Sequence, residues 1–208
     1  MSFKTQKYEI IRNAISKELA HFSFNYLLLK SRAVDHMLST KHILTKDSGK
    51  NNYGHFSDKQ AIGSYSVYGD PLIETLLMKL LVPIQLITRS KLVPCYGYSR
   101  LYEKGAILKR HTDRTSCETS ATLHLGGDPW KIYLQISKKD IGIHLTPGDM
   151  LIYDGVTIEH ERHRFTGEAH GQAFLHYNNT KGKYGKKNKF DGRAWLGLPY
   201  CFKRGSTK

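Results

Sequence analysis

The stretch GDMLIYDGVTIEHERHRF, residues 148–165, decides the fold expected for this 208-residue chain. A Gly-Asp turn leads into an apolar run, an Asp-Gly pair ends that run, and a charged stretch around His160 follows. Short apolar runs bounded by turn residues are typical of β-strands. About seven such runs follow one another between residues 92 and 178, so we expect an all-β sandwich or barrel in the second half of the chain.

The first half is different in character, because good helix formers dominate it. Ser16 precedes a long stretch of such residues and is a candidate N-cap, and Asp70 followed by proline is typical of a second helix start. Residues 40–69, between these two segments, are rich in Gly, Asn, Ser and Tyr and are expected to form a long loop. We therefore predict one mainly β domain, with N-terminal helices, over residues 1–208: helical support and loop (1–90), β core (91–180) and a basic C-terminal segment (181–208).

The C-terminal segment carries much of the net charge of +14. Residues 181–208 contain nine basic residues and one acidic residue, Asp191, with Tyr184, Phe190 and Trp195 between them. Basic residues interleaved with aromatic ones suit a polyanion such as nucleic acid. A solvated tail that improves solubility explains the same composition, and both interpretations stay open here.

Cysteine usage and hydropathy point to a reducing, cytoplasmic environment. The three cysteines are far apart and form no CxxC pair, which argues against a disulfide framework and against a cysteine zinc site: Cys95, Cys117 and Cys201. The opening MSFKTQKYEIIRN is polar and lacks the apolar core of a secretory signal. The most apolar segment, residues 76–87, is short and interrupted by Lys79 and Pro83, so we expect no membrane partner.

One tripeptide, His111-Thr112-Asp113, has the spacing of a metal site. A chain with 11 histidines and 18 acidic residues contains about one His-x-Asp/Glu by chance, so the context must carry the argument. Residues i and i+2 of a strand share a face, and His160 lies in another expected strand that can return beside the first. Two imidazoles and one carboxylate on one face of a metal leave the opposite positions open, which suits non-haem Fe(II).

Around this tripeptide the sequence resembles a known family. The segments YEKGAILKRHTD, LHLGG and TPGDMLIYDGVTIEHERHRFTGEAHGQAFLHYN resemble the Fe(II)/2-oxoglutarate-dependent oxygenases, with most similarity to their prolyl-hydroxylase-like branch, which includes phage-encoded members. The resemblance covers roughly residues 93–200, and the pieces stand in the family's order. It implies a double-stranded β-helix (a jelly roll, cupin-like) buttressed by helices. It also implies Fe(II) bound by His111, Asp113 and His160, 2-oxoglutarate and O₂ as cosubstrates, and ascorbate as a reductant.

The sequence departs from the family where the 2-oxoglutarate carboxylate is bound. Many members carry an arginine or lysine nine to eleven residues after the distal histidine, but here these positions are residues 169–171, Ala-His-Gly. A buried dianion still needs a cation or several donors. By strand parity Arg162 and Arg164 share a face with His160, so we predict Arg162 as the carboxylate ligand and Arg164 as the second choice.

Two further positions, Tyr102 and Leu108, enter through the resemblance. Tyr102 precedes a glycine as a tyrosine does in prolyl-hydroxylase-like members, and is expected to donate to 2-oxoglutarate. Gln172 or His170 is expected to support the arginine. Leu108 stands where many relatives carry a tyrosine, so that cosubstrate contact is expected to be absent. His163 falls on the opposite face from His160 in a regular strand, which favours His160 as the ligand.

The resemblance implies an oxygenase that hydroxylates a protein or peptide, with prolyl hydroxylation as the obvious subtype. The positive charge supports a variant that acts on nucleic acid. Two other classes stay open. A zinc hydrolase would use the same ligands with a glutamate as base (Glu118, Glu159 or Glu161), and a β-sandwich binding module would have no catalytic role.

Overall fold

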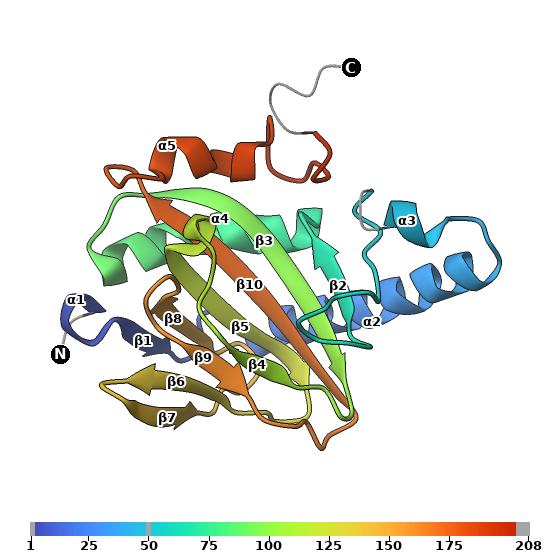
Figure 1. Cartoon of the computed structure of the whole chain (residues 1–208), viewed down its shortest axis with the longest axis horizontal. Coiled ribbons are helices and arrows are strands. Elements are labelled where there is room, and N and C mark those ends of the chain that lie inside the picture. Colours follow the sequence, from blue (N-terminus) through green and yellow to red (C-terminus); the bar gives the residue numbers. More distant parts are fainter. Residues whose placement is uncertain (1–2, 49–50, 203–208) are drawn as a thin grey trace.

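The computed structural model describes residues 3–48 and 51–202, and these residues form two antiparallel sheets that face each other (Figure 1). The major sheet has the order β1-β8-β5-β10-β3-β2 and the minor sheet the order β4-β9-β6-β7. The strands are β1 (Tyr8–Ile11), β2 (Tyr65–Tyr68), β3 (Leu92–Glu103), β4 (Leu108–His111), β5 (Thr119–Gly127), β6 (Ile132–Ile136), β7 (Lys139–Ile143), β8 (Met150–Asp154), β9 (His160–Arg162) and β10 (Ala169–Asn179). This arrangement confirms the expected jelly-roll core.

The two long helices begin where the sequence predicts. The helices are α1 (Phe3–Gln6), α2 (Lys17–Ser39), α3 (Thr45–Ser48), α4 (Pro71–Thr88) and α5 (Gly185–Asn188), with short 3₁₀ turns η1 (Thr115–Cys117) and η2 (Lys189–Gly192). The Ser16 side chain accepts a hydrogen bond from the Leu19 amide at 3.2 Å, and the Asp70 side chain accepts one from the Leu72 amide at 2.9 Å. Both contacts satisfy an amide that the first turn of a helix leaves free.

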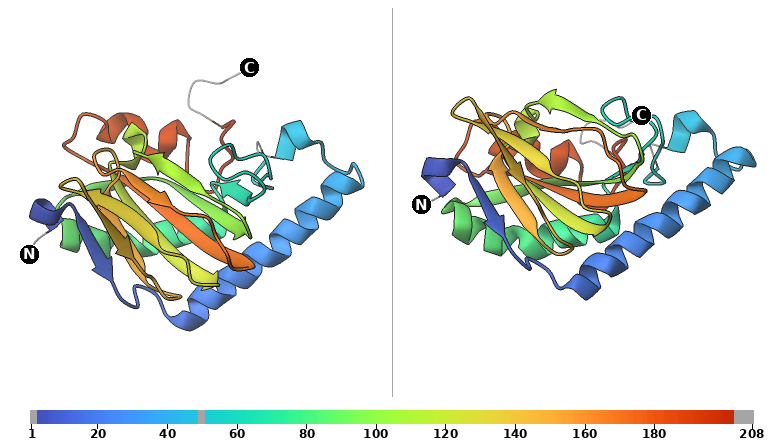
Figure 2. Two further views of the ribbon diagram at one scale, coloured as in Figure 1. Left: turned by 60° about the horizontal axis from the view of Figure 1, so that its bottom comes forward. Right: turned by 90° about the horizontal axis from the view of Figure 1, so that it is seen from below.

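Alternation along β10 separates the two sides of the major sheet. Leu175 and Tyr177 point outward to the helices, and the Tyr177 hydroxyl donates to the Leu77 carbonyl of α4 at 2.7 Å. Gln172 and His176 point into the space between the sheets. Helices α2 and α4 thus cover the outer face of the major sheet and leave its inner face for the site (Figure 2).

Helix α4 is long and apolar enough to cross a membrane by length and composition alone, and it is the single helix of this kind among the described residues. One of its faces, with Ile73, Leu77, Leu80 and Ile84, is buried against the sheet. Such burial is typical of a core helix.

The region expected to supply only helices and a loop also supplies both edge strands of the major sheet. Strand β1 pairs with β8, and β2 pairs with β3. The segment 40–69, expected to be a loop, contains α3 and β2, and His55 forms a β-bridge with Ser66. Both strands have only four residues, too few for a clear alternating pattern.

The C-terminal segment is packed onto the body as far as the structure describes it, whereas residues 203–208 lie outside the described part. The fully buried Arg193 guanidinium pairs with Glu74 of α4, with Nη2 and Oε1 2.5 Å apart. The backbone amide of Gly197 donates to the same carboxylate. A buried charge needs such a partner, so this pair anchors the segment.

Candidate metal centre

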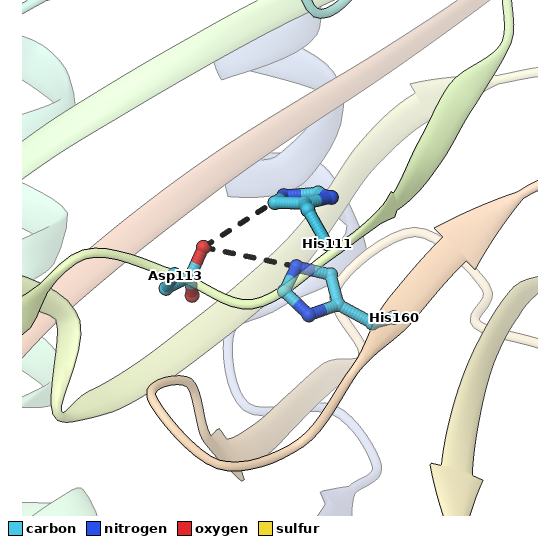
Figure 3. Close-up of side chains that lie close together, drawn as sticks. All are labelled: His111, Asp113 and His160. Atoms are coloured by element: carbon cyan, nitrogen blue, oxygen red, sulfur yellow. Dashed lines mark ion pairs between the residues drawn. The ribbon is translucent and has the colours of Figure 1, made fainter.

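The structure brings His111, Asp113 and His160 together (Figure 3). His111 ends β4 and His160 begins β9, and the two residues are paired across the minor sheet. One ligand atom from each of the three residues lies within 4.8 Å of the others. Asp113 Oδ1 is 3.9 Å from His111 Nε2 and 3.7 Å from His160 Nε2. Two ring nitrogens and one carboxylate therefore face a common point.

The backbone fixes which nitrogen each histidine presents. His111 Nδ1 lies 2.8 Å from the Lys109 carbonyl, and His160 Nδ1 lies 3.1 Å from the Ile158 carbonyl. A carbonyl can only accept, so each Nδ1 carries the hydrogen and each Nε2 presents a lone pair toward Asp113. Burial also lowers the pKa of His160, which favours the neutral ring that a metal requires.

Asp113 follows β4 in a loop that packs tightly against the turn after β8. The Asp113 amide donates to the Gly155 carbonyl at 2.8 Å. A Cβ atom at Gly155 would lie 2.4 Å from the Cys117 carbonyl oxygen and 2.5 Å from Asp113 Oδ2. Only glycine fits this approach, so the Asp-Gly turn visible in the sequence positions the carboxylate.

The second carboxylate oxygen of Asp113 is held by the protein. Ser120 Oγ donates to Oδ2 at 2.6 Å and lies 3.1 Å from His176 Nδ1, from which it can accept. Asp113, Cys117 and His176 also lie close enough to form a second candidate ligand group. The Ser120 hydroxyl already bridges Asp113 and His176, so we interpret this group as a hydrogen-bond network that orients the carboxylate.

Ser120→Ala is expected to weaken divalent-metal binding by roughly 10–100-fold, because Asp113 loses the partner that orients it. The measurement is a competition titration with a metal-sensitive dye. The control is Ser99→Ala, because Ser99 is equally buried and its hydroxyl has no partner. Equal affinities in the two variants would contradict an orienting role for Ser120.

A cavity of about 280 Å³ opens beside the three residues. Its walls include Tyr153 of β8 and four further rings from β2, β3 and β10: Tyr68, Tyr96, Tyr98 and Phe174. Burial raises the pKa of Tyr153 and of Tyr96 well above the ordinary value, so both phenols stay protonated. The cavity thus combines five aromatic rings with the polar and charged side chains around the three residues.

The cavity also contains an arginine, Arg100, that the sequence pattern did not indicate. Arg100 Nε donates to Asp58 Oδ2 at 2.8 Å, and Nη2 donates to Gln60 Oε1 at 2.7 Å. Asp58 comes from the segment 40–69 and neutralises this guanidinium. Strand parity from Tyr102 would have placed Arg100 on the inner face, but nothing in the sequence indicates its partner.

Arg162 is buried between the sheets without a counterion. It is 1% exposed, and no carboxylate of the described residues lies within ion-pair distance. Nη1 donates to the Trp130 carbonyl at 2.5 Å, the guanidinium lies 5.0 Å from the centre of the Trp130 ring, and Nε has no partner. Burial lowers the pKa of Arg162 to about 10. An uncompensated buried cation is costly, so this arrangement indicates an anion site.

The other predicted cosubstrate residues divide into two groups. Gln172, with its amide oxygen toward Arg162, accepts from Nη2 at 3.1 Å, and Tyr102 is buried with its ring centre 4.9 Å from that of Trp130. Arg164, in contrast, lies beyond the end of β9, is exposed and has its Nη1 3.4 Å from the Gly105 carbonyl. The structure therefore brings Arg162, Gln172 and Tyr102 together and does not bring Arg164 to them.

None of the three candidate glutamates for a zinc hydrolase lines the cavity. Glu118 accepts hydrogen bonds from the Asn178 side chain and the Asn179 amide, and Glu161 pairs with Arg110. Glu159 is exposed. His163, the rival ligand, is also exposed and stacks on Tyr133. Within the described residues, the cavity thus offers metal ligands without a hydrolytic glutamate.

Comparison with known proteins agrees with this geometry at the level of the fold. The sequence matches no protein-family model and no curated protein. A prolyl-4-hydroxylase from Pseudomonas putida is similar in structure, with a TM-score of 0.60 and 14% identity over 85% of this chain and 95% of that chain. HygX from Streptomyces hygroscopicus, bound to nickel, 2-oxoglutarate and hygromycin B, has a TM-score of 0.62 and 13% identity over 86% and 85%.

A third similar structure is a prolyl hydroxylase from Trichoplax adhaerens in complex with a hypoxia-inducible-factor peptide fragment. Its TM-score is 0.58 at 15% identity, over 86% of this chain and 84% of that chain. At such identities the likeness defines a class by fold: this chain has the jelly-roll architecture of the 2-oxoglutarate- and Fe(II)-dependent oxygenases. The fold expected from the sequence resemblance is therefore confirmed.

Proposed function

We propose that this protein is an Fe(II)- and 2-oxoglutarate-dependent dioxygenase that hydroxylates a macromolecular substrate. The observation that carries the proposal is the presence, in one barrel, of two imidazoles and a carboxylate around a common point and of a buried arginine without a counterion. The first group suits Fe(II), and the second suits a dicarboxylate that reaches from the metal into the barrel.

Each residue of the site would have a distinct role. His111, Asp113 and His160 would hold the metal, and Ser120 would keep the Asp113 carboxylate oriented. Arg162 would pair with the distal carboxylate of 2-oxoglutarate, supported by Gln172 and Tyr102. When bound, the metal and 2-oxoglutarate supply O₂ activation coupled to decarboxylation, with succinate and CO₂ as products. The aromatic walls of the cavity would exclude water and orient the C–H bond of the substrate.

Two substrate classes are candidates, and each is favoured by one observation. The likeness to a hydroxylase with a bound peptide favours a polypeptide, with proline as the obvious residue. The positive charge of the segment beside the cavity favours a nucleic acid.

The proposed reaction is tested by incubating the protein with Fe(II), 2-oxoglutarate and O₂ and measuring succinate. We expect slow succinate formation without substrate, and none when Zn²⁺ replaces Fe(II). Formation of no succinate by a protein that binds stoichiometric Fe(II) and 2-oxoglutarate would refute the proposal. Hydrolytic activity with Zn²⁺ would favour the hydrolase instead.

A further inference from the structure

We propose that the C-terminal segment from Lys181 to Trp195 binds single-stranded nucleic acid and guides it to the metal cavity. The proposal rests on the proposed function for the identity of the cavity, but the binding itself requires neither iron nor 2-oxoglutarate. The bound nucleic-acid strand would carry the group that reacts in the cavity.

This segment exposes five lysines to solvent. The five lysines, here called the lysine strip, are Lys181, Lys183, Lys186, Lys187 and Lys189. All five are exposed, and no carboxylate in the described part of the chain forms an ion pair with them. Asp191, the one acidic residue of the segment, is buried and pairs with Arg114. The strip therefore presents uncompensated positive charge to solvent.

The segment that carries the lysine strip is tied to residues beside the metal cavity. Arg114, the residue after the metal ligand Asp113, donates from Nη1 and Nη2 to both oxygens of Asp191 at 3.1 and 3.0 Å. Tyr68, a wall of the cavity, donates to Asp191 Oδ2 at 2.7 Å. The Asn188 side chain donates from Nδ2 to the Thr115 carbonyl at 3.1 Å. These contacts tie the segment to Arg114 and Tyr68, which line the cavity, and α5 lies beside β3 and β10 (Figure 1).

An apolar groove lies against the same segment. Phe190 and Asp191 have positive φ values of 56° and 54°, which few non-glycine residues adopt and which surrounding contacts must stabilise. Asp191 contacts the cavity wall, whereas Phe190 lines an apolar groove of about 570 Å³ together with Trp195. Trp195 is 66% exposed, and Lys189 at the groove has its Nζ 5.0 Å from the centre of the Phe190 ring.

Lysines beside an exposed indole suit a nucleic-acid strand better than an acidic peptide. Single strands bind through phosphates on basic side chains and through bases stacked on aromatic rings. Carboxylates are recognised best by the planar fork of arginine. The two arginines in or beside this segment already pair with carboxylates. The Arg114 guanidinium binds Asp191, and the Arg193 guanidinium binds Glu74. The remaining cations of the segment are lysine ammonium groups. They act as point charges, which bind phosphates without a fixed geometry.

The test is fluorescence anisotropy of a dye-labelled oligothymidylate, without iron or 2-oxoglutarate. The triple variant Lys186→Gln/Lys187→Gln/Lys189→Gln is expected to bind roughly tenfold more weakly or worse, and the slope of log affinity against log salt should fall by about 2. The matched control is Lys131→Gln/Lys138→Gln/Lys139→Gln, which removes the same charge from exposed sites on the minor sheet. We expect a change of less than about twofold in that control.

Two further arms test the kind of partner. Trp195→Ala is expected to weaken binding by roughly fivefold or more, because one stacked base contributes about 1–3 kcal/mol. Poly-glutamate is expected to compete only weakly with the oligonucleotide. Equal losses in both triple variants, an unchanged Trp195→Ala, or equally strong competition by poly-glutamate would each overturn the proposal, the last in favour of an acidic protein.

A separate measurement tests whether the bound nucleic acid is guided to the cavity. With Fe(II), 2-oxoglutarate and O₂, the oligonucleotide is expected to raise succinate formation above that of the protein alone, and to do so less in the lysine-strip variant. Tight binding without stimulation would overturn the guiding role. A wild-type protein that forms no succinate under any condition would instead refute the proposed function and leave the anisotropy result standing.

Discussion

His160→Ala is expected to abolish both stoichiometric Fe(II) binding and succinate formation. His160 would supply one of the three proposed ligands, and its side chain is 3% exposed beside Asp113 and His111. Its removal leaves a two-ligand site in contact with solvent, so the loss should exceed the roughly 10–100-fold that removal of an outer partner causes. Metal analysis after desalting and a succinate assay measure the two effects, and circular dichroism checks that the fold persists.

His163→Ala is the matched control for this experiment. His163 lies three residues away, but its ring is exposed and stacks on Tyr133. We expect metal content and succinate formation to remain at the wild-type level. A His160→Ala protein that keeps stoichiometric iron, or a His163→Ala protein that loses it, would contradict the assignment of the ligands.

Arg162→Met is expected to have two opposite effects. The variant should bind 2-oxoglutarate at least 30-fold more weakly, because loss of a buried charge partner costs roughly 2–5 kcal/mol. The metal-free protein should nevertheless become more stable, by on the order of 1–4 kcal/mol, because an apolar side chain replaces a buried cation that has no counterion. For a chain of this size, each kcal/mol corresponds to about 2–4 °C in melting temperature.

The opposite signs separate a binding role from a structural one. If Arg162 only supported the core through Trp130, its replacement would lower the melting temperature and leave the affinity for 2-oxoglutarate unchanged. The control is Arg164→Met, at the exposed position that was the second choice. We expect its stability to change by less than about 0.5 kcal/mol and its affinity for 2-oxoglutarate to remain unchanged.

Strand parity predicted the inner residues well wherever a strand is regular. His160 and Arg162 share the inner face of β9 because they stand two apart in one strand. The same rule included Arg164, but β9 ends at Arg162 and the chain turns outward. The sequence does not show where β9 ends, because charged residues continue past Arg162. Boundaries of a three-residue strand depend on its partners rather than on local preference.

Contacts between distant segments could not be predicted from the sequence. Asp58 pairs with Arg100, although the sequence predicts a loop around Asp58. Asp191 pairs with Arg114, although the sequence predicts a basic tail around Asp191. Each carboxylate is unremarkable in its local sequence. Their roles follow from the topology, which brings the segments to the mouth of the barrel, and periodicity carries no information about such pairs.

The most direct test of the account is an anaerobic titration of the Fe(II)-loaded protein with 2-oxoglutarate, followed by visible difference spectroscopy. If His111, Asp113 and His160 leave one face of the iron open for the cosubstrate, a metal-to-ligand charge-transfer band should appear and saturate at one 2-oxoglutarate per chain. The band should persist in Arg164→Met and be absent in Asp113→Ala. A wild-type protein that holds stoichiometric iron but shows no band at saturating 2-oxoglutarate would contradict the assignment of this site.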